Sequence, residues 1–265
     1  MDLLLVLKAI ILGVVEGITE FLPISSTGHL ILVNQWIAFD PAFTKVFDVV
    51  IQLGAILAVL VYFKKDLCVL CKDKDKRPEV IALWEKLIIG VIPAMILGAL
   101  FANKIEEKLF NPFTVAVALI VGGIILIVVE KRKHKEAFIS IKQLPTKTIL
   151  LIGLFQCLAM IPGTSRSAAT IIGALLLGAS RVVAVEFSFF LAIPTVIAAS
   201  AYSLIKHWQN MSSTDLAVLA VGFLTAFFSA LLVISCFMKF IRKHSLATFG
   251  HYRIILGLLI LLFLK

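Results

Sequence analysis

Acidic, hydroxyl and imidazole side chains gather near the N-terminus of a chain that is otherwise strongly apolar. Glu16 and Glu20 are four residues apart, so they share one face of a helix. Pro23 ends that helix, and Ser26 and His29 lie one turn apart on the next. Carboxylates can hold a cation or a proton, and a serine beside an imidazole can act as a nucleophile with its base. The spacing predicts a polar site inside an apolar environment.

Simpler interpretations of these residues stay open. Ser25, Ser26 and Thr27 are suitable N-caps for the second helix, which would explain each hydroxyl without chemistry. Glu16 and Glu20 would need no partner if they lay at a water interface. The polar turn that follows them favours a lined cavity instead, because irregular backbone at membrane depth must be buried or line water.

A second polar segment, PGTSRS, begins at Pro162 and carries a positive charge. Arg166 lies at a predicted helix start, where backbone N–H groups and a planar guanidinium both favour phosphate oxygens. Gly163 allows close backbone approach. Arg166 could instead form a structural ion pair with Glu16 or Glu20. The neighbouring hydroxyls favour phosphate. Together with residues of the first polar turn they form the expected substrate-binding set: Ser25, Thr27, Gly163, Thr164, Ser165, Ser167 and Thr170.

The composition indicates a membrane protein. Hydrophobic residues are 61% of 265 positions, charged residues are 15%, and mean hydropathy is +1.07. A spanning helix needs about 20 apolar residues. Six stretches are predicted to span fully: 45–63, 84–102, 113–130, 182–205, 215–238 and 252–264.

The basic residues predict the orientation of these spans. They concentrate in the segments 64–86, 131–147 and 239–253, the last counting Lys239, Arg242, Lys243 and Arg253. Such loops face the cytoplasm, and anionic lipid is a sufficient partner for their charge, so nucleic acid is not expected. Parity then requires 3–39 and 148–180 to enter the membrane and return on the same side. The first of these re-entrant hairpins opens outside and the second inside.

The expected fold is therefore an all-α polytopic membrane protein of one domain, 1–265. It has six full transmembrane helices and two opposed re-entrant hairpins in an inverted-topology repeat. The first repeat covers 1–137 and the second 147–265. Gln52 and Gln156 are interpreted as helix–helix contacts, and the roles of Asp48 and Glu186 stay open.

The two polar segments resemble the signature regions of the undecaprenyl pyrophosphate phosphatase family, the bacitracin-resistance phosphatases of bacterial membranes. The segment GVVEGITEFLPISSTGHL contains ExxxE and PxSSxxH, and PGTSRSAAT contains PGxSRSxxT. The matches extend to every motif position, and length and hydrophobic profile agree across the chain.

This resemblance implies hydrolysis of undecaprenyl pyrophosphate to undecaprenyl phosphate and inorganic phosphate, which recycles the lipid carrier for cell-wall polymers. It implies a divalent cation, Mg²⁺ or Ca²⁺, held by Glu16 and Glu20. Either serine or histidine could attack phosphorus. The spacing favours Ser26 as nucleophile, with His29 as base or proton donor and Arg166 on the phosphate oxygens. We expect the bacterial inner membrane, a site open to the periplasm and a lipid substrate, and leave a homodimer open.

Three other functions fit these residues less well. The type 2 phosphatidic-acid phosphatase pattern fails because Ile172 stands where its second motif needs histidine. A structural scaffold would leave the buried charges without a use. A transporter or flippase for polyprenyl phosphate lipids fits the inverted repeat, but it needs no nucleophile, so the Ser26–His29 pair favours an enzyme.

Overall fold

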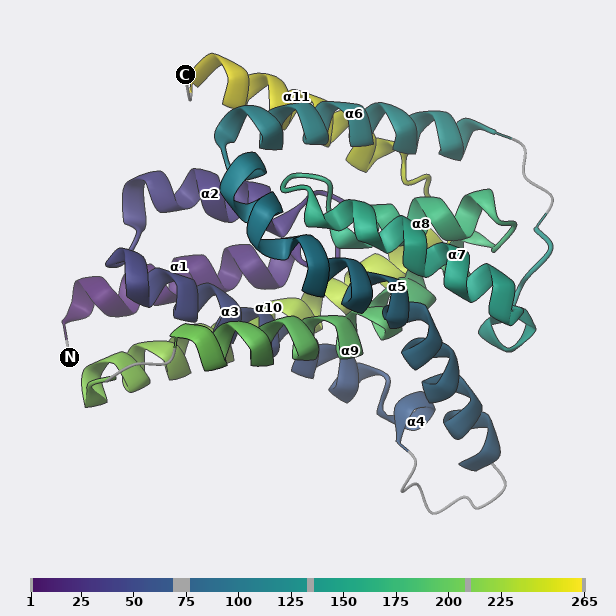
Figure 1. Ribbon diagram of the computed structural model, residues 1–265, viewed down its shortest axis with the longest axis horizontal. Helices are drawn as coiled ribbons and strands as arrows, with labels where there is room; N and C mark the ends of the chain where they lie inside the picture. Colours follow the sequence, from purple (N-terminus) through teal and green to yellow (C-terminus); the bar gives the residue numbers. More distant parts are fainter. Residues whose placement is uncertain (1, 69–76, 133–135, 208–210, 264–265) are drawn as a thin grey trace.

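A computed structural model describes residues 2–68, 77–132, 136–207 and 211–263. No strand occurs in these ranges, and helices account for most of them. In chain order they are α1 Leu3–Thr19, α2 Ser26–Ile37, α3 Pro41–Tyr62, α4 Lys64–Leu67, α5 Arg77–Leu109, α6 Pro112–Lys131, η2 Ile141–Gln143, α7 Thr146–Cys157, η3 Leu158–Met160, α8 Arg166–Leu176, α9 Arg181–His207, α10 Ser213–Ile241 and α11 Ala247–Phe263 (Figure 1).

Short polar side chains begin several of these helices. Asp40, which directly precedes Pro41, accepts from two backbone N–H groups of α3. Asn111, which directly precedes Pro112, accepts from Thr114 N of α6. Ser212 begins α10 with a capping box. Proline at the first helical position loses no hydrogen bond, because that N–H has no partner within the helix. The sequence therefore marks the starts of the long apolar helices locally.

Two helical hairpins face each other across the middle of the molecule. α1 and α2 lie side by side on one side of Figure 1, and α7 and α8 lie side by side on the other, with the turns of both hairpins near the centre. They match the predicted hairpins 3–39 and 148–180 closely in position along the chain. Three long helices follow each hairpin, α3, α5 and α6 after the first and α9, α10 and α11 after the second.

Within the described residues, five helices are long and apolar enough to cross a membrane: α3, α5, α6, α9 and α10. The predicted sixth span, 252–264, falls in α11, which begins earlier, at Ala247, and has 17 residues in the described chain. At a rise of 1.5 Å per residue, such a helix is shorter than a typical hydrocarbon core of about 30 Å. The protein is thus an all-helical membrane protein with five candidate spans, and the six-span count is not confirmed.

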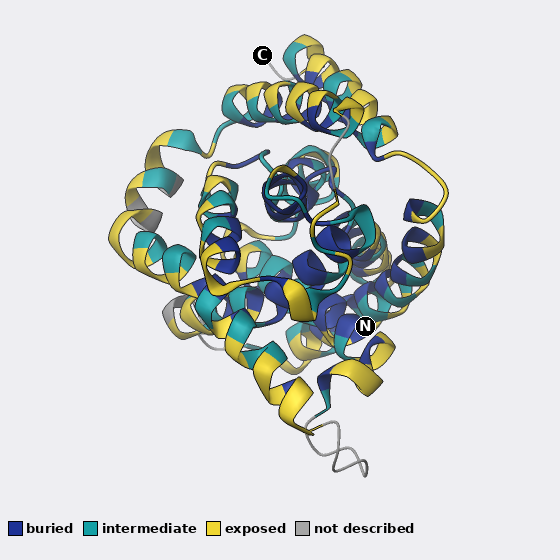
Figure 2. Cartoon of the chain, turned by 90° about the vertical axis from the view of Figure 1, so that its right-hand side faces the viewer, coloured by how far each residue is buried: buried dark blue, intermediate teal, exposed yellow. Residues whose placement is uncertain are grey.

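The outer faces of the bundle carry apolar side chains. Large hydrophobic residues are exposed along α1, α5, α6, α10 and α11. Figure 2 shows buried residues gathered in the middle of the bundle and exposed ones on the peripheral helices. In α8, all residues from Ser167 to Leu175 are buried. An apolar outer surface around a packed centre is expected of a protein surrounded by lipid.

One end of the bundle is held together by charged side chains. Glu130 of α6 accepts from Arg181 Nε at 2.8 Å, Ser245 Oγ at 3.2 Å and Leu246 N at 3.1 Å. These contacts join α6, the start of α9 and the α10–α11 turn. They involve one of the basic segments predicted to face the cytoplasm, 239–253. Residues 69–76 and 133–135, within the other basic segments, lie outside the described chain.

Candidate functional site

The turns of both hairpins end in the same local structure. Ser25 and Ser165 have positive φ angles of 71° and 70°. Each is the N-cap of the next helix and accepts a backbone N–H three residues on, Gly28 N at 3.3 Å and Ala168 N at 3.2 Å. Positive φ is uncommon for residues with a side chain and is concentrated at functional sites. The turns therefore store strain where the polar side chains meet.

Glu20, Ser26 and Arg166 meet in one cluster, here called the triplet. Ser26 Oγ donates to Glu20 Oε2 at 2.6 Å, and Arg166 Nη2 donates to Glu20 Oε1 at 3.2 Å. The side chains of Arg166 and Glu20 are only 11% and 9% exposed, so water screens their attraction little. The structure thus joins an acid, a hydroxyl and a cation from two segments that are 146 residues apart.

Arg166 is held from a second side. Its Nη1 donates to the carbonyl of Ser188 at 3.0 Å, and Ser188 Oγ bonds Thr170 Oγ1 at 2.6 Å. Its Nε is buried and has no hydrogen-bond partner in the part of the chain that the structure describes. A buried N–H normally finds an acceptor, so the open Nε indicates room for one. The ion pair with Glu20, which the sequence left open as an alternative to phosphate binding, is present, and it leaves donor capacity for an anion.

Glu16 lies one helical turn before Glu20 and is fully buried. Neither of its carboxylate oxygens has a hydrogen-bond partner among the described residues. A bare buried carboxylate is costly and requires a proton or a cation. No group of three or more histidine, cysteine, aspartate or glutamate side chains suited to a metal occurs in the described chain. Any cation here would rest on one or two carboxylates.

No hydrogen bond joins the side chains of His29 and Ser26, which bond other partners. Its Nδ1 lies 2.8 Å from the carbonyl of Ser25, and its Nε2 lies 2.7 Å from the hydroxyl of Tyr252, whose ring stacks on the imidazole. A carbonyl can only accept, so Nδ1 carries the proton and a neutral ring accepts from Tyr252 at Nε2. The expected Ser26–His29 hydrogen bond is absent, and Glu20 takes the place predicted for the imidazole.

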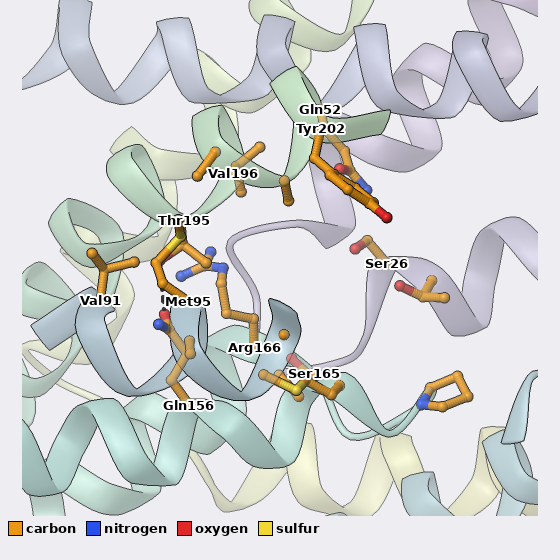
Figure 3. A pocket seen from close by; sticks show the side chains of 18 of the residues that line it. Ser26, Gln52, Val91, Met95, Gln156, Ser165, Arg166, Thr195, Val196 and Tyr202 are labelled. Atoms are coloured by element: carbon orange, nitrogen blue, oxygen red, sulfur yellow. Dashed lines mark hydrogen bonds between the residues drawn. The ribbon is translucent and has the colours of Figure 1, made fainter. Parts of the chain in front are cut away.

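A cavity of about 590 Å³ opens onto the triplet. Figure 3 shows Arg166 between Ser165 on one side and Gln156 and Thr195 on the other, with Gln52 and Tyr202 on the side of Ser26. Most of the remaining wall is apolar. It comes from α5 and α9, with Val91, Ala94, Met95, Gly98, Val196, Ala198 and Ala199, and from η3, with Ala159 and Met160. A polar end beside an apolar wall suits a ligand with a charged head and a hydrocarbon tail.

The predicted binding residues divide into two groups. Ser25, Thr27, Gly163 and Ser165 line the cavity with the triplet. The others lie outside its lining. Ser167 Oγ donates to the carbonyl of Leu22 at 2.9 Å and so joins the two turns, Thr170 supports Ser188, and Thr164 lies in the turn itself. Gln52 and Gln156, interpreted as helix contacts, also line the cavity.

Sequence reasoning missed two residues of α11. Arg253 was counted as a basic residue of a cytoplasmic loop, which is wrong, because it is fully buried inside the helix. Tyr252 was not considered, although it holds His29. The sequence did contain a signal for Arg253, because an apolar run follows it directly. A charged residue in or beside such a run marks an intramembrane site.

The fold and the site define a class: a polytopic helical membrane protein with a buried serine–carboxylate–arginine cluster at facing helix breaks. Residues 9–259 match the family of the bacitracin resistance protein BacA. The chain belongs to this family, which confirms the resemblance drawn from the two motifs.

Similar proteins have consistent names. The chain is 50% identical over 264 residues to undecaprenyl-diphosphatase 1 of Clostridioides difficile, covering 98% of this chain and 96% of that protein. It is 49% identical over 263 residues to undecaprenyl-diphosphatase 2 of Shewanella oneidensis, covering 98% of each. It is 48% identical over 259 residues to the undecaprenyl-diphosphatase of a Thermoanaerobacter species, covering 97% of this chain and 96% of that protein.

Proposed function

We propose that this protein hydrolyses undecaprenyl diphosphate to undecaprenyl phosphate and inorganic phosphate in the bacterial inner membrane. The observation that carries the proposal is the triplet at the end of an apolar-walled cavity: Ser26 donates to Glu20 at 2.6 Å and Arg166 to the same carboxylate at 3.2 Å. The names of the similar proteins support the substrate. The reaction returns the lipid carrier to cell-wall synthesis and accounts for bacitracin resistance.

The triplet can carry out the reaction in two steps. Ser26 Oγ attacks the terminal phosphorus, its proton passes to Glu20, and the bond from that phosphorus to the bridging oxygen breaks. Undecaprenyl phosphate leaves with the bonding electrons and takes the proton from Glu20, which is again a carboxylate, and the phosphoryl group stays on Ser26. Water then attacks phosphorus, gives its proton to Glu20, and the phosphate leaves as the proton returns to the serine oxygen. Glu20 thereby acts as general base and then general acid.

Arg166 supplies the positive charge for the phosphoryl oxygens. Its buried Nε has no hydrogen-bond partner among the described residues, and it lines the cavity within the first turn of α8. Arg166 is the first residue of α8, and the positive end of the helix dipole there adds to the attraction for an anion. Negative charge that builds up on the phosphoryl oxygens during attack is stabilised by groups already in place.

The carboxylates of Glu16 and Glu20 fit a divalent cation, Mg²⁺ or Ca²⁺. Both oxygens of Glu16 are buried and unpaired, and these ions prefer oxygen ligands. Mg²⁺ is commonly held by one or two carboxylates together with substrate phosphate oxygens, so two glutamates are enough. When bound, the cation would neutralise phosphate charge and act as a Lewis acid. Without it, Glu16 needs a proton.

His29 has a supporting role in this scheme. Both ring nitrogens are engaged, one by the Ser25 carbonyl and one by Tyr252. In that arrangement it holds the first turn of α2, which begins with Ser26. Direct attack by His29, or proton donation from it, would require the ring to leave both partners. Ser26 with Glu20 needs no such movement.

Phosphate release by the purified protein in detergent separates hydrolysis from lipid transport. With a C55 diphosphate as substrate, we expect stoichiometric phosphate and undecaprenyl phosphate. EDTA should abolish release, and Mg²⁺ or Ca²⁺ should restore it. A flippase without hydrolysis releases no phosphate, so the absence of release from monodisperse protein with added cation would reject the proposal. Release that is insensitive to EDTA would reject the cation alone.

The proposed topology has six spans and two re-entrant hairpins in an inverted repeat, with the site open to the periplasm. The matching caps at Ser25 and Ser165 support an internal repeat, since they are 140 residues apart and adopt the same backbone conformation. In this topology α11 is the sixth span. The possibility of a homodimer is open to size measurement in detergent.

Cysteine labelling tests this orientation. In a variant without native cysteines, a cysteine at Ala42 should react with a membrane-impermeant thiol reagent on intact cells. A cysteine at Asp75, which lies outside the described residues, should react only after lysis. Ala42 lies in the first turn of α3 and is exposed. Labelling of both positions on intact cells, or the reverse pattern, would reject the orientation.

A further inference from the structure

Arg253 links the two hairpin turns from a third element. It lies in α11 and is completely buried. Its Nη1 donates to the carbonyl of Pro23 at 3.2 Å, and its Nη2 donates to the carbonyl of Gly163 at 3.1 Å. Pro23 belongs to the turn before α2, and Gly163 belongs to the turn before α8. One guanidinium therefore bonds the backbone of both turns at once.

The remaining donors of Arg253 anchor it to α6. Nε donates to the carbonyl of Leu119 at 3.3 Å, and Nη2 also donates to that of Ala118 at 3.2 Å. In the described chain, all hydrogen bonds of this side chain thus go to backbone carbonyls, and none goes to a carboxylate. The charge is compensated by oriented carbonyl dipoles, which fix a position more strictly than an ion pair with a mobile acid.

The turns need such a donor because broken helices leave carbonyls without partners. Residues at a helix end have no intrahelical donor for their carbonyls, and water is scarce at membrane depth. A carbonyl left unpaired there is costly. A planar guanidinium offers five N–H groups in a rigid fork, so it can satisfy two turns while bound to a third helix. A lysine ammonium is a single point with three donors.

Glycines bring α11 close enough to α6 for this contact. A Cβ on Gly123 would lie 2.6 Å from the carbonyl oxygen of Gly250, and a Cβ on Gly122 would overlap Arg253 Nη2 and lie 3.0 Å from its Cζ. The space beside Gly122 is thus the space that the guanidinium fills. Any side chain at that position would push the guanidinium away from the turns.

We propose that Arg253 is a positioning residue that holds the two turns in register and so sets the placement of Ser26 relative to Arg166. Ser26 follows Pro23 by three residues, and Arg166 follows Gly163 by three. The geometry between nucleophile and phosphate ligand therefore depends on a residue that touches neither substrate nor triplet. The catalytic part of this proposal rests on the proposed hydrolysis, whereas the clamping of the turns does not.

Two variants test the proposal by different routes. Arg253→Lys keeps the charge but cannot bond all four carbonyls. Gly122→Ala leaves the arginine intact and displaces its guanidinium. We expect each to lower kcat by about 10- to 100-fold, the effect of small misplacements of reacting groups. KM should stay within about threefold, because the cavity is retained. Two matched controls should turn over like wild type. Arg181→Lys changes the ion pair with Glu130, and Val121→Ala changes the exposed face of α6.

Hydrogen–deuterium exchange supplies a readout independent of activity. Both test variants should raise exchange in peptides covering 20–27 and 161–167 together, while α6 and α11 stay protected. A merely structural role would instead raise exchange along α6 and α11 and lower the folded fraction in proportion to activity. If Arg253→Lys fails to fold, Gly122→Ala decides the question on its own.

The outcomes separate the two proposals. If the wild type releases no phosphate, the proposed hydrolysis is rejected. Hydrogen–deuterium exchange in the two turns would still test whether Arg253 holds them together. An active wild type with normal kcat and normal turn exchange in both variants would overturn the role of Arg253 and leave hydrolysis standing. Exchange that rises in only one turn would also overturn it, because the clamp requires both.

Discussion

Replacing Glu20 by glutamine tests the chemistry of the triplet with almost no change in shape. The carboxylate accepts from Ser26 at 2.6 Å and from Arg166 at 3.2 Å. An amide can offer its oxygen to only one of them. With the oxygen towards Arg166, the amide N–H₂ faces Ser26 Oγ and cannot take its proton. Turnover should therefore fall by about 10²- to 10⁴-fold, the range for loss of a general base.

The same substitution should weaken the fold by a smaller amount. A hydrogen bond to a charged group contributes about 1.5–3 kcal/mol, and the side chains of Arg166 and Glu20 are only 11% and 9% exposed, so screening reduces this little. Arg166 keeps the carbonyl of Ser188 and, through the amide oxygen, part of the bond to position 20. We expect a loss of about 1.5 kcal/mol, the lower end of this range.

Steady-state phosphate release and thermal unfolding of the purified variant in one detergent measure both effects. Glu79→Gln is a suitable control, because Glu79 pairs with Lys142 at 2.7 Å while its side chain is 53% exposed. Exposed pairs contribute at most about 1 kcal/mol, so this variant should unfold and turn over nearly as wild type does. Turnover by Glu20→Gln within a factor of about three of wild type would refute the assignment of the base.

Three further substitutions follow from the same contacts. Arg166→Lys should fold yet lose most of its turnover, because an ammonium cannot hold Glu20 and phosphate oxygens as a planar fork does, and near-normal phosphate release would contradict this. Gly163→Ala should lower both the melting temperature and activity, since φ is +90° and a Cβ would lie 2.8 Å from Val115 Cα; an unchanged melting temperature would show that the turn tolerates the shift. Tyr252→Phe should cost about 0.5–1.5 kcal/mol but leave turnover close to wild type, whereas a large loss of turnover would return His29 to the chemistry.

The sequence was most informative where chemistry and chain geometry are local. Pro23 and Pro162 end helices for steric reasons, so both breaks were predictable. The basic segments then required the two hairpins to point at each other, which brought Arg166 towards Glu20 and Ser26. The structure confirms that contact.

The sequence was least informative about α11. Whether His29 meets Ser26 or Tyr252 depends on a helix 223 residues further along the chain. The place of Arg253 likewise depends on how α11 lies against α6, which is set by close packing at Gly123 and Gly250. Neither contact leaves a local pattern. Helical spacing alone correctly put Ser26 and His29 one turn apart, yet it could not exclude a stronger partner for each.

Single-turnover phosphate release by Ser26→Ala tests the central claim most directly. Ser26 provides the attacking oxygen in this account, so we predict a loss of at least about a thousandfold. Ser25→Ala is the matched variant, because Ser25 caps α2 through a bond to Gly28 N and lacks the bond to Glu20; it should retain much of its turnover. Substantial phosphate release by Ser26→Ala, together with none by His29→Ala, would show that histidine attacks and would contradict the account.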